Sequence, residues 1–195
     1  MTRQVEFYYD YGSPAAYLAW ARLPAICSDH GAELVRKPIL LGGLFKATGN
    51  QTPVNVKPKG EWMFDDLARH ASHYDVPFEK NPYFIINTLP LMRGAMWAEL
   101  NGQLENYDQV MFEAIWVHAK DMNTPEVIAS VLETGGFGAR EVFEAVQQQD
   151  IKDRLIAATE EAAGKGLFGV PSMIVNGELH FGQDRLDWVE RAIAS

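Results

Sequence analysis

The chain has little cysteine: one residue, Cys27, among 195. A single cysteine cannot form an internal disulfide, and its isolation agrees with a reducing compartment. We therefore expect a cytoplasmic protein. Cys27 falls late in a predicted helix, next to Ile26. In that position we expect it to pack as a small hydrophobic side chain.

Positive charge is also scarce, since 17 Lys and Arg face 26 Asp and Glu and give a net charge of −9. A nucleic acid or an anionic membrane surface would favour a clustered excess of basic residues, and the sequence has no basic stripe. Polar residues interrupt every apolar run well short of the roughly 20 residues that a membrane-spanning helix needs. Residues 1–4 lead directly into a predicted strand without the apolar core of a signal peptide. We expect neither nucleic acid nor membrane as a partner.

What the sequence does have is enough apolar material for one sizeable core, at 47% hydrophobic residues. No internal repeat or low-complexity segment is present. The composition predicts a single domain over residues 1–195.

The most informative stretch is the junction between a predicted strand, Val5 to Tyr9, and a helix that begins at Pro14. Ser13 stands at the N-cap position, where its hydroxyl can accept a bond from a first-turn amide. The aligned peptide dipoles place about half a positive charge at this end of the helix, worth roughly 0.3–2 kcal/mol to an anion. Ser13 either only caps the helix or binds an anionic group there, and both interpretations stay open at this point.

The rest of the chain falls into three parts. The first helix is predicted to run to about His30, followed by a strand from Glu33 to Leu40, with Gly42-Gly43 marking the exit from the sheet. From Leu44 to Gly164 the pattern is helical, with predicted helix starts at Thr88, Thr124 and Asp150. The stretch from Gly49 to Gly60 is the only long loop we expect, and a loop of that length favours a lid or a binding segment.

The C-terminal part returns to strands. Gly169-Val170-Pro171 precedes a predicted strand from Ser172 to Val175, Asn176-Gly177 is a strong two-residue hairpin turn, and a partner strand and a short helix follow. Together with the N-terminal strand and helix, these are the two halves of a thioredoxin-like fold. We predict an α/β protein with a thioredoxin-like frame at 1–45 and 165–195 and a large all-helical insertion at 46–164.

Five segments keep their order over nearly the whole chain, namely 10–17, 37–45, 48–50, 169–171 and 181–185. Together they resemble the 2-hydroxychromene-2-carboxylate isomerase family and its relatives, the kappa-class glutathione transferases and the DsbA-type oxidoreductases. The redox relatives carry Cys-x-x-Cys where this chain has residues 13–16, so disulfide exchange is not expected here. The resemblance also implies that the Val170-Pro171 bond is cis and that the backbone of Val170 pairs with an extended peptide.

The function that the resemblance implies is a glutathione-dependent interconversion of 2-hydroxychromene-2-carboxylate and trans-o-hydroxybenzylidenepyruvate in naphthalene-type catabolism. It further implies glutathione as cofactor, a small aromatic carboxylate as substrate and a homodimer. Carried over by motif, Ser13 is the catalytic residue and holds the thiolate. The cofactor-binding set is Ser13, Val170, Phe181, Gly182, Gln183 and Asp184. The substrate-binding set is Lys46, Asn55, Val56 and Phe84.

Several departures from the family pattern lie on the substrate side. Gly12 stands where a bulkier residue is usual, Trp62 replaces a tyrosine, and Phe84 is not followed by proline. Two alternatives therefore stay open: a kappa-like transferase, which would consume glutathione, and a non-catalytic thioredoxin-fold module that takes up an extended peptide.

Histidine offers no competing chemistry. None of the five histidines falls in a triad-like motif that could activate a serine nucleophile. His70 and His73 have an i, i+3 spacing but no third ligand nearby, so we expect no metal site.

Overall fold

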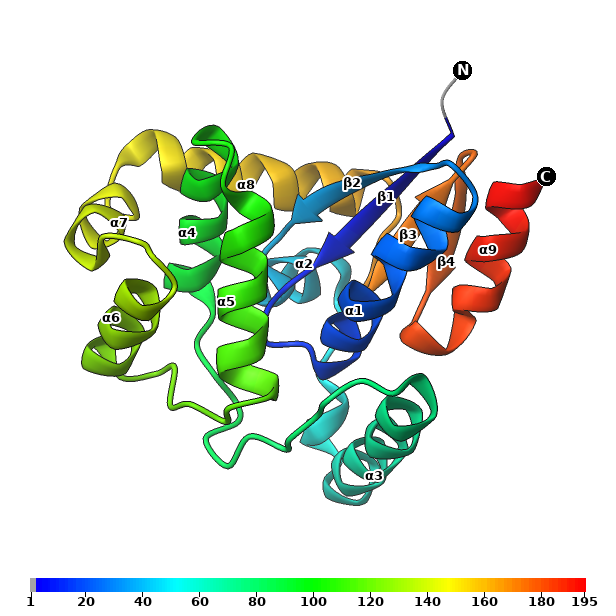
Figure 1. Ribbon diagram of the computed structural model, residues 1–195, viewed down its shortest axis with the longest axis horizontal. Coiled ribbons are helices and arrows are strands. Elements are labelled where there is room, and N and C mark those ends of the chain that lie inside the picture. The colour runs from blue at the N-terminus through cyan, green and yellow to red at the C-terminus, as the bar shows by residue number, and fades with distance from the viewer. Residues whose placement is uncertain (1–2) are drawn as a thin grey trace.

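The centre of the protein is a four-stranded mixed sheet with the strand order β2-β1-β3-β4 (Figure 1). The computed structural model describes residues 3–195. The strands are β1 (Gln4–Tyr9), β2 (Glu33–Pro38), β3 (Ser172–Val175) and β4 (Glu178–Phe181). β1 runs parallel to β2, with Val5 opposite Leu34, and antiparallel to β3, with Phe7 opposite Met173. The apolar run from Phe7 to Tyr9 is buried because helices cover both faces of the sheet.

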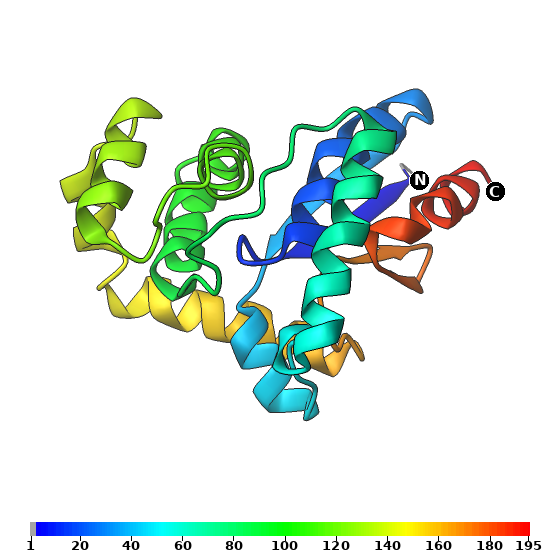
Figure 2. The ribbon, with the colours of Figure 1, turned by 90° about the horizontal axis from the view of Figure 1, so that it is seen from below.

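Helices lie on both sides of this sheet. α1 (Pro14–Asp29) and α9 (Leu186–Ala194) cover one face, and α8 (Gln149–Gly164) runs along the other (Figures 1 and 2). α2 (Leu41–Thr48) packs on α8. The β-α-β unit at the N-terminus and the β-hairpin with α9 at the C-terminus form a thioredoxin-like fold, which confirms the predicted fold class.

The remaining helices come between α2 and α8 in the chain. They are the 3₁₀ turn η1 (Pro53–Asn55), α3 (Lys57–Tyr74), α4 (Leu89–Leu100), α5 (Leu104–Trp116), α6 (Pro125–Thr134) and α7 (Ala139–Ala145). α4 and α5 lie beyond the β2 edge with α6 and α7 outside them, whereas α3 returns to pack against α1 (Figure 1). The helical part thus reaches the start of α1 from two sides.

Most local predictions are confirmed. Ser13, Thr88 and Thr124 are the N-cap residues of α1, α4 and α6. Asn176 and Gly177 have φ angles of 51° and 82°, as a two-residue hairpin turn requires. The Val170-Pro171 bond is cis. Cys27 is buried, with 2% of its surface exposed.

Three local predictions need correction. β2 ends at Pro38 rather than at Leu40. Gly42 and Gly43 lie inside α2, and the helix needs a glycine because a Cβ on Gly43 would stand only 3.2 Å from Cγ2 of Thr159 on α8.

The stretch from Gly49 to Gly60 is also not one continuous loop. It contains η1, and α3 begins at Lys57 with a proline in its first turn. In the part of the chain that the structure describes, no helix has both the length and the apolar character needed to cross a membrane.

Candidate active site

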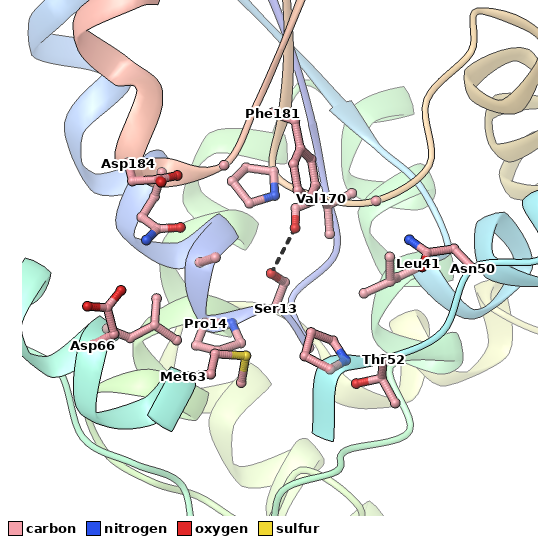
Figure 3. Close-up of a pocket in the computed structure, with 18 of the residues that line it drawn as sticks. Ser13, Pro14, Leu41, Asn50, Thr52, Met63, Asp66, Val170, Phe181 and Asp184 are labelled. Atoms are coloured by element: carbon pink, nitrogen blue, oxygen red, sulfur yellow. Dashed lines mark hydrogen bonds between the residues drawn. The ribbon is translucent and has the colours of Figure 1, made fainter. Parts of the chain in front are cut away.

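Ser13 lies at the junction that the sequence singles out. Its Oγ accepts a hydrogen bond from the backbone N–H of Ala16, at 3.1 Å, and so caps α1. The same Oγ lies 3.4 Å from the carbonyl oxygen of Val170, next to the cis peptide bond (Figure 3). The hydroxyl therefore stands at the positive end of α1 and faces the loop before β3. A contact of 3.4 Å is a weak hydrogen bond, so the hydroxyl proton can turn to a ligand at little cost.

A cavity of about 400 Å³ opens in front of this hydroxyl. Its walls come from the start of α1, one face of α2, η1, α3, the loop before β3 and the turn after β4. Volumes of this order are typical of sites for small molecules. No histidine or cysteine from residues 3–195 lines the cavity, and within those residues no group of three metal-ligating side chains is found.

Charged groups of both signs line the cavity. Asp66 and Asp184 lie on one side of Ser13, and the polar side chains of Asn50 and Thr52 lie on the other (Figure 3). Lys59 and Arg185 also line the wall. Asp184 forms an ion pair with Arg185 at 2.6 Å, so its end of the cavity carries charges of both signs, whereas Asn50 and Thr52 supply neutral polar groups at the other end.

The loop before β3 presents free backbone to the cavity. Among the described residues, the N–H of Val170 donates to no protein group, although this residue is only 7% exposed. The N–H of Gly182 donates to the carbonyl of Pro171 at 3.0 Å and fixes the adjacent turn. Buried backbone donors are rarely left without a partner, so the free N–H of Val170 favours a ligand that carries a peptide group.

Asp10 organises the loop that leads to Ser13. Its side chain is 1% exposed, and its two oxygens accept hydrogen bonds from the N–H groups of Gly12 and Leu41, each at 2.8 Å. Burial raises the pKa of Asp10, and these bonds lower it in part. The Thr88 side chain also lies beside this carboxylate and helps to lower its pKa. The sequence reasoning gave Asp10 no role, although an Asp two residues before a glycine is a recognisable turn signal.

A second buried carboxylate, that of Asp108, holds the chain at the end of β1, just before the same loop. Asp108 on α5 is fully buried and accepts hydrogen bonds from the hydroxyls of Tyr9 and Tyr11, at 2.7 Å and 2.6 Å. The indole N–H of Trp116 donates to the carbonyl of Tyr11 at 2.8 Å. Burial raises the pKa of Asp108 to about 7. The strand end before Ser13 is thus held by α5.

The structure brings together part of the predicted site. All the predicted cofactor-binding residues line the cavity with Phe84, namely Ser13, Val170, Phe181, Gly182, Gln183 and Asp184. Lys46, Asn55 and Val56, predicted for the substrate, do not line it. Val56 is 58% exposed, and the Asn55 amide donates to the side chain of Gln51 at 3.2 Å.

Lys46 lies on the other side of α2. Leu41 and Phe45, spaced i and i+4, face the Ser13 cavity, whereas Gly43, Lys46 and Ala47 line a separate cavity against α8. The expectation that Lys46 lies beside Ser13 is therefore not met, because the helical periodicity of α2 turns this side chain away.

Six polar lining residues were not among the predicted site residues, namely Asn50, Gln51, Thr52, Lys59, Asp66 and Arg185. The first four fall within the predicted binding segment from Gly49 to Gly60, so their segment was indicated even though they were not singled out. Asp66 lies in the middle of α3, and no local pattern distinguishes it from other acidic residues on helices.

Comparison with known proteins agrees with this geometry. Residues 4–194 match the family model described as "DSBA-like thioredoxin domain". The chain belongs to this family. The DSBA-like chain is 30% identical over 192 residues to 2-hydroxychromene-2-carboxylate isomerase of Sphingobium xenophagum, covering 97% of each chain. It is 27% identical to human glutathione S-transferase kappa 1, covering 96% of this chain and 89% of that one.

The fold agrees as well. A solved structure of a 2-hydroxychromene-2-carboxylate isomerase superposes with a TM-score of 0.88 at 27% identity, covering 98% of this chain and 94% of that one. This DSBA-like chain has no cysteine at its site, and burial raises the pKa of its only thiol, Cys27, to about 11. Any thiol chemistry at Ser13 must come from a ligand.

Proposed function

We propose that the chain is a glutathione-dependent cis-trans isomerase that interconverts 2-hydroxychromene-2-carboxylate and trans-o-hydroxybenzylidenepyruvate. One observation carries the proposal. The Ser13 hydroxyl stands at the start of α1, 3.4 Å from the carbonyl of Val170, in a cavity that has free backbone donors and no cysteine. Relatives named for this isomerase activity, 30% identical over nearly the full length, support it.

The cavity fits glutathione, a tripeptide with a charged group at each end. The free N–H and the carbonyl of Val170 would pair with its cysteinyl backbone as a short added strand. Asp184, with Asp66 on the same side, would face the ammonium group of the γ-glutamyl end, and Asn50 and Thr52 would face the glycyl carboxylate (Figure 3). When bound, glutathione would supply a thiolate, a nucleophile that can add reversibly to a conjugated double bond and so permit rotation about it.

Ser13 would stabilise that thiolate. Its hydroxyl would donate a hydrogen bond to the sulfur, and the positive end of α1 favours the anion. Together these two interactions can supply about 2 kcal/mol, which lowers a thiol pKa of about 8.5 by roughly 1.5 units. Asp10 would keep the hydroxyl in place through its bonds to Gly12 and Leu41.

An aromatic acid would enter beside the sulfur. Phe84, Trp62 and Met63 supply an apolar wall on the α3 side of the cavity, suited to an aromatic ring. We further propose that the protein works as a cytoplasmic homodimer in the breakdown of aromatic compounds. The single buried cysteine agrees with a reducing compartment, whereas the homodimer and the pathway follow from the family resemblance alone.

The alternative is a glutathione transferase, which the likeness to the kappa-class enzymes favours. The two differ in what happens to glutathione, because an isomerase returns it and a transferase consumes it. Titration of free thiol during turnover of the chromene acid, alongside measurement of the two isomers, separates them. Loss of thiol in step with product would overturn the isomerase and support the transferase.

The test of the site compares Ser13→Ala with Ser13→Thr. We expect the alanine variant to raise the pKa of bound glutathione by about 0.5–1 unit, because the hydrogen bond is lost while the positive end of α1 remains. The pKa is measured by ultraviolet absorbance of the thiolate against pH, and the dissociation constant should change little. The threonine variant keeps the hydroxyl and should keep the low pKa. An unchanged pKa in Ser13→Ala would remove the role of Ser13, and absence of glutathione binding to the wild type would overturn the proposed function.

A further inference from the structure

A second cavity of about 400 Å³ lies on the opposite side of α2 from Ser13. It is enclosed by α2, the start of α4 and the first half of α8. Figure 2 shows α2 lying alongside α8, with α4 next to them. Apolar side chains form its wall, namely Leu40, Leu89, Leu155 and Ile156. Ile156 is 53% exposed, so it offers apolar surface to a ligand in this cavity.

The charges around this cavity are nearly all positive. Lys46, Arg93 and Lys152 line it, against a single acid, Glu160. The protein as a whole carries a net charge of −9, so a local excess of cations is unexpected by composition. Like charges around one cavity repel each other, and an anion between them would relieve that repulsion.

These cations lack partners within the protein. Among residues 3–195, none of the three forms an ion pair with an acidic side chain. The Nε of Arg93 is buried and has no hydrogen-bond partner. A buried donor left unsatisfied is destabilising, and more so when it belongs to a charged group. The arrangement is therefore incomplete without an acceptor.

We propose that this cavity binds a small organic anion, a carboxylate on an aromatic or branched apolar body. The carboxylate would take the hydrogen bonds of Arg93 and Lys152, and the apolar body would lie against Leu89, Leu155 and Ile156. A simple inorganic anion would leave that apolar wall exposed, and the volume is in the range of sites for small molecules rather than of macromolecular interfaces. Because α2 separates it from the Ser13 cavity, the site is distinct from that cavity and does not rest on glutathione binding.

The experiment uses 2-naphthoate, with neutral 2-naphthamide as its matched control, on ¹⁵N-labelled full-length protein. We expect naphthoate to shift the amide resonances of Gly43, Ala47 and Ile156, and the amide to bind at least tenfold more weakly because it has no charge to pair with the cations. Equal affinity for the two probes, or shifts confined to Gly12 and Ala15 at the other cavity, would overturn the proposal.

Two variants on one helix test which residues hold the anion. Lys152→Met removes a cation from the cavity, whereas Arg154→Met removes a cation two residues away that does not line it. We expect Lys152→Met to weaken naphthoate about three- to tenfold and Arg154→Met to leave it unchanged. Both positions lie on the outer part of α8, so neither variant should impair folding. Equal losses would mean a general charge effect and would overturn the site.

Arg93→Met provides a second measurement. It keeps the aliphatic part of the side chain and removes the unpartnered donor, so the variant should lose about tenfold in affinity for naphthoate while its thermal stability holds or rises. Unchanged affinity in this variant would contradict the role of Arg93.

Discussion

The two cavities on either side of α2 have the same volume, about 400 Å³, but differ in their charges. The Ser13 cavity offers free backbone groups and charges of both signs, with carboxylates gathered at one side. The second cavity offers an apolar wall and three cations against one acid. A ligand for the first should carry both charges and a peptide backbone, whereas a ligand for the second needs only an anionic group and an apolar body. The volume of a cavity alone therefore does not indicate its ligand. The charged side chains and the unpaired backbone groups that line the cavity do.

The largest loss that should affect only one cavity is expected from Gly182→Ala. Gly182 has a φ of 98°, and a Cβ would collide with the side chains of Asp184 and Arg185. We expect glutathione affinity, measured by calorimetry, to fall about 10- to 100-fold, with naphthoate binding at the second cavity unchanged.

Gly177→Ala is the matched control for that change. Gly177 also has a positive φ, 82°, but a Cβ there meets nothing within 4 Å, and the residue lies in the hairpin turn away from both cavities. This variant should lose stability without losing affinity for glutathione. If both alanine variants lowered glutathione affinity equally, the turn after β4 would have no specific role.

A medium effect on ligand affinity is expected from removing one cation from each cavity in turn. Lys59→Met removes a cation from the Ser13 cavity, and Lys46→Met removes one from the other. We expect Lys59→Met to weaken glutathione about three- to tenfold with no effect on naphthoate at the second cavity, and Lys46→Met to do the reverse. A raised KM for the chromene acid in Lys46→Met, with glutathione affinity unchanged, would return Lys46 to the substrate site that the sequence suggested.

The smallest effect on ligand affinity is expected from pH acting through Asp108. Its pKa in the folded protein is raised to about 7 by burial, so the folded state holds this proton more tightly than the unfolded chain does. The stabilisation is complete below about pH 4, the pKa of an unperturbed Asp, and is lost as pH rises through about 7.

Asp108→Asn removes that titration. Between pH 5 and pH 8 we expect the wild type to lose roughly 1–3 kcal/mol of unfolding free energy relative to the variant, measured by urea denaturation, because each pKa unit is worth about 1.4 kcal/mol. Both affinities should change less than twofold. Parallel pH curves for the two proteins would show that Asp108 does not carry this proton.

The sequence predicted the thioredoxin-like frame because its signals are local. Ser13 and Pro14 begin a helix, and Asn176 and Gly177 form a hairpin turn. The motif around Pro171 marks the loop before β3. The position of Lys46 could not be predicted in the same way. It depends on the helical phase of α2 and on α8, which lies more than a hundred residues further along the chain. α8 packs so closely on α2 that a Cβ on Gly43 would make a tight contact with Thr159.

The buried carboxylates were also beyond local reasoning. Asp108 lies between Tyr107 and Gln109, close to other polar residues of α5. Nothing in that local sequence shows that the hydroxyls of Tyr9 and Tyr11 will donate to it. The turn at Asp10 can be predicted from the local sequence. The hydrogen bond that the N–H of Leu41 donates to Asp10 cannot, because it forms only when β1 and α2 are brought together in the fold.

Asp10 has a further consequence for how the molecule opens. Its carboxylate accepts hydrogen bonds from the turn before α1 and from the first residue of α2, and so links the end of β1 to the first helix after the sheet. Local opening of either segment would strip a hydrogen bond from a buried carboxylate. The amides of Gly12 and Leu41 should therefore exchange with deuterium together, as one cooperative unit, rather than as parts of two separately opening regions.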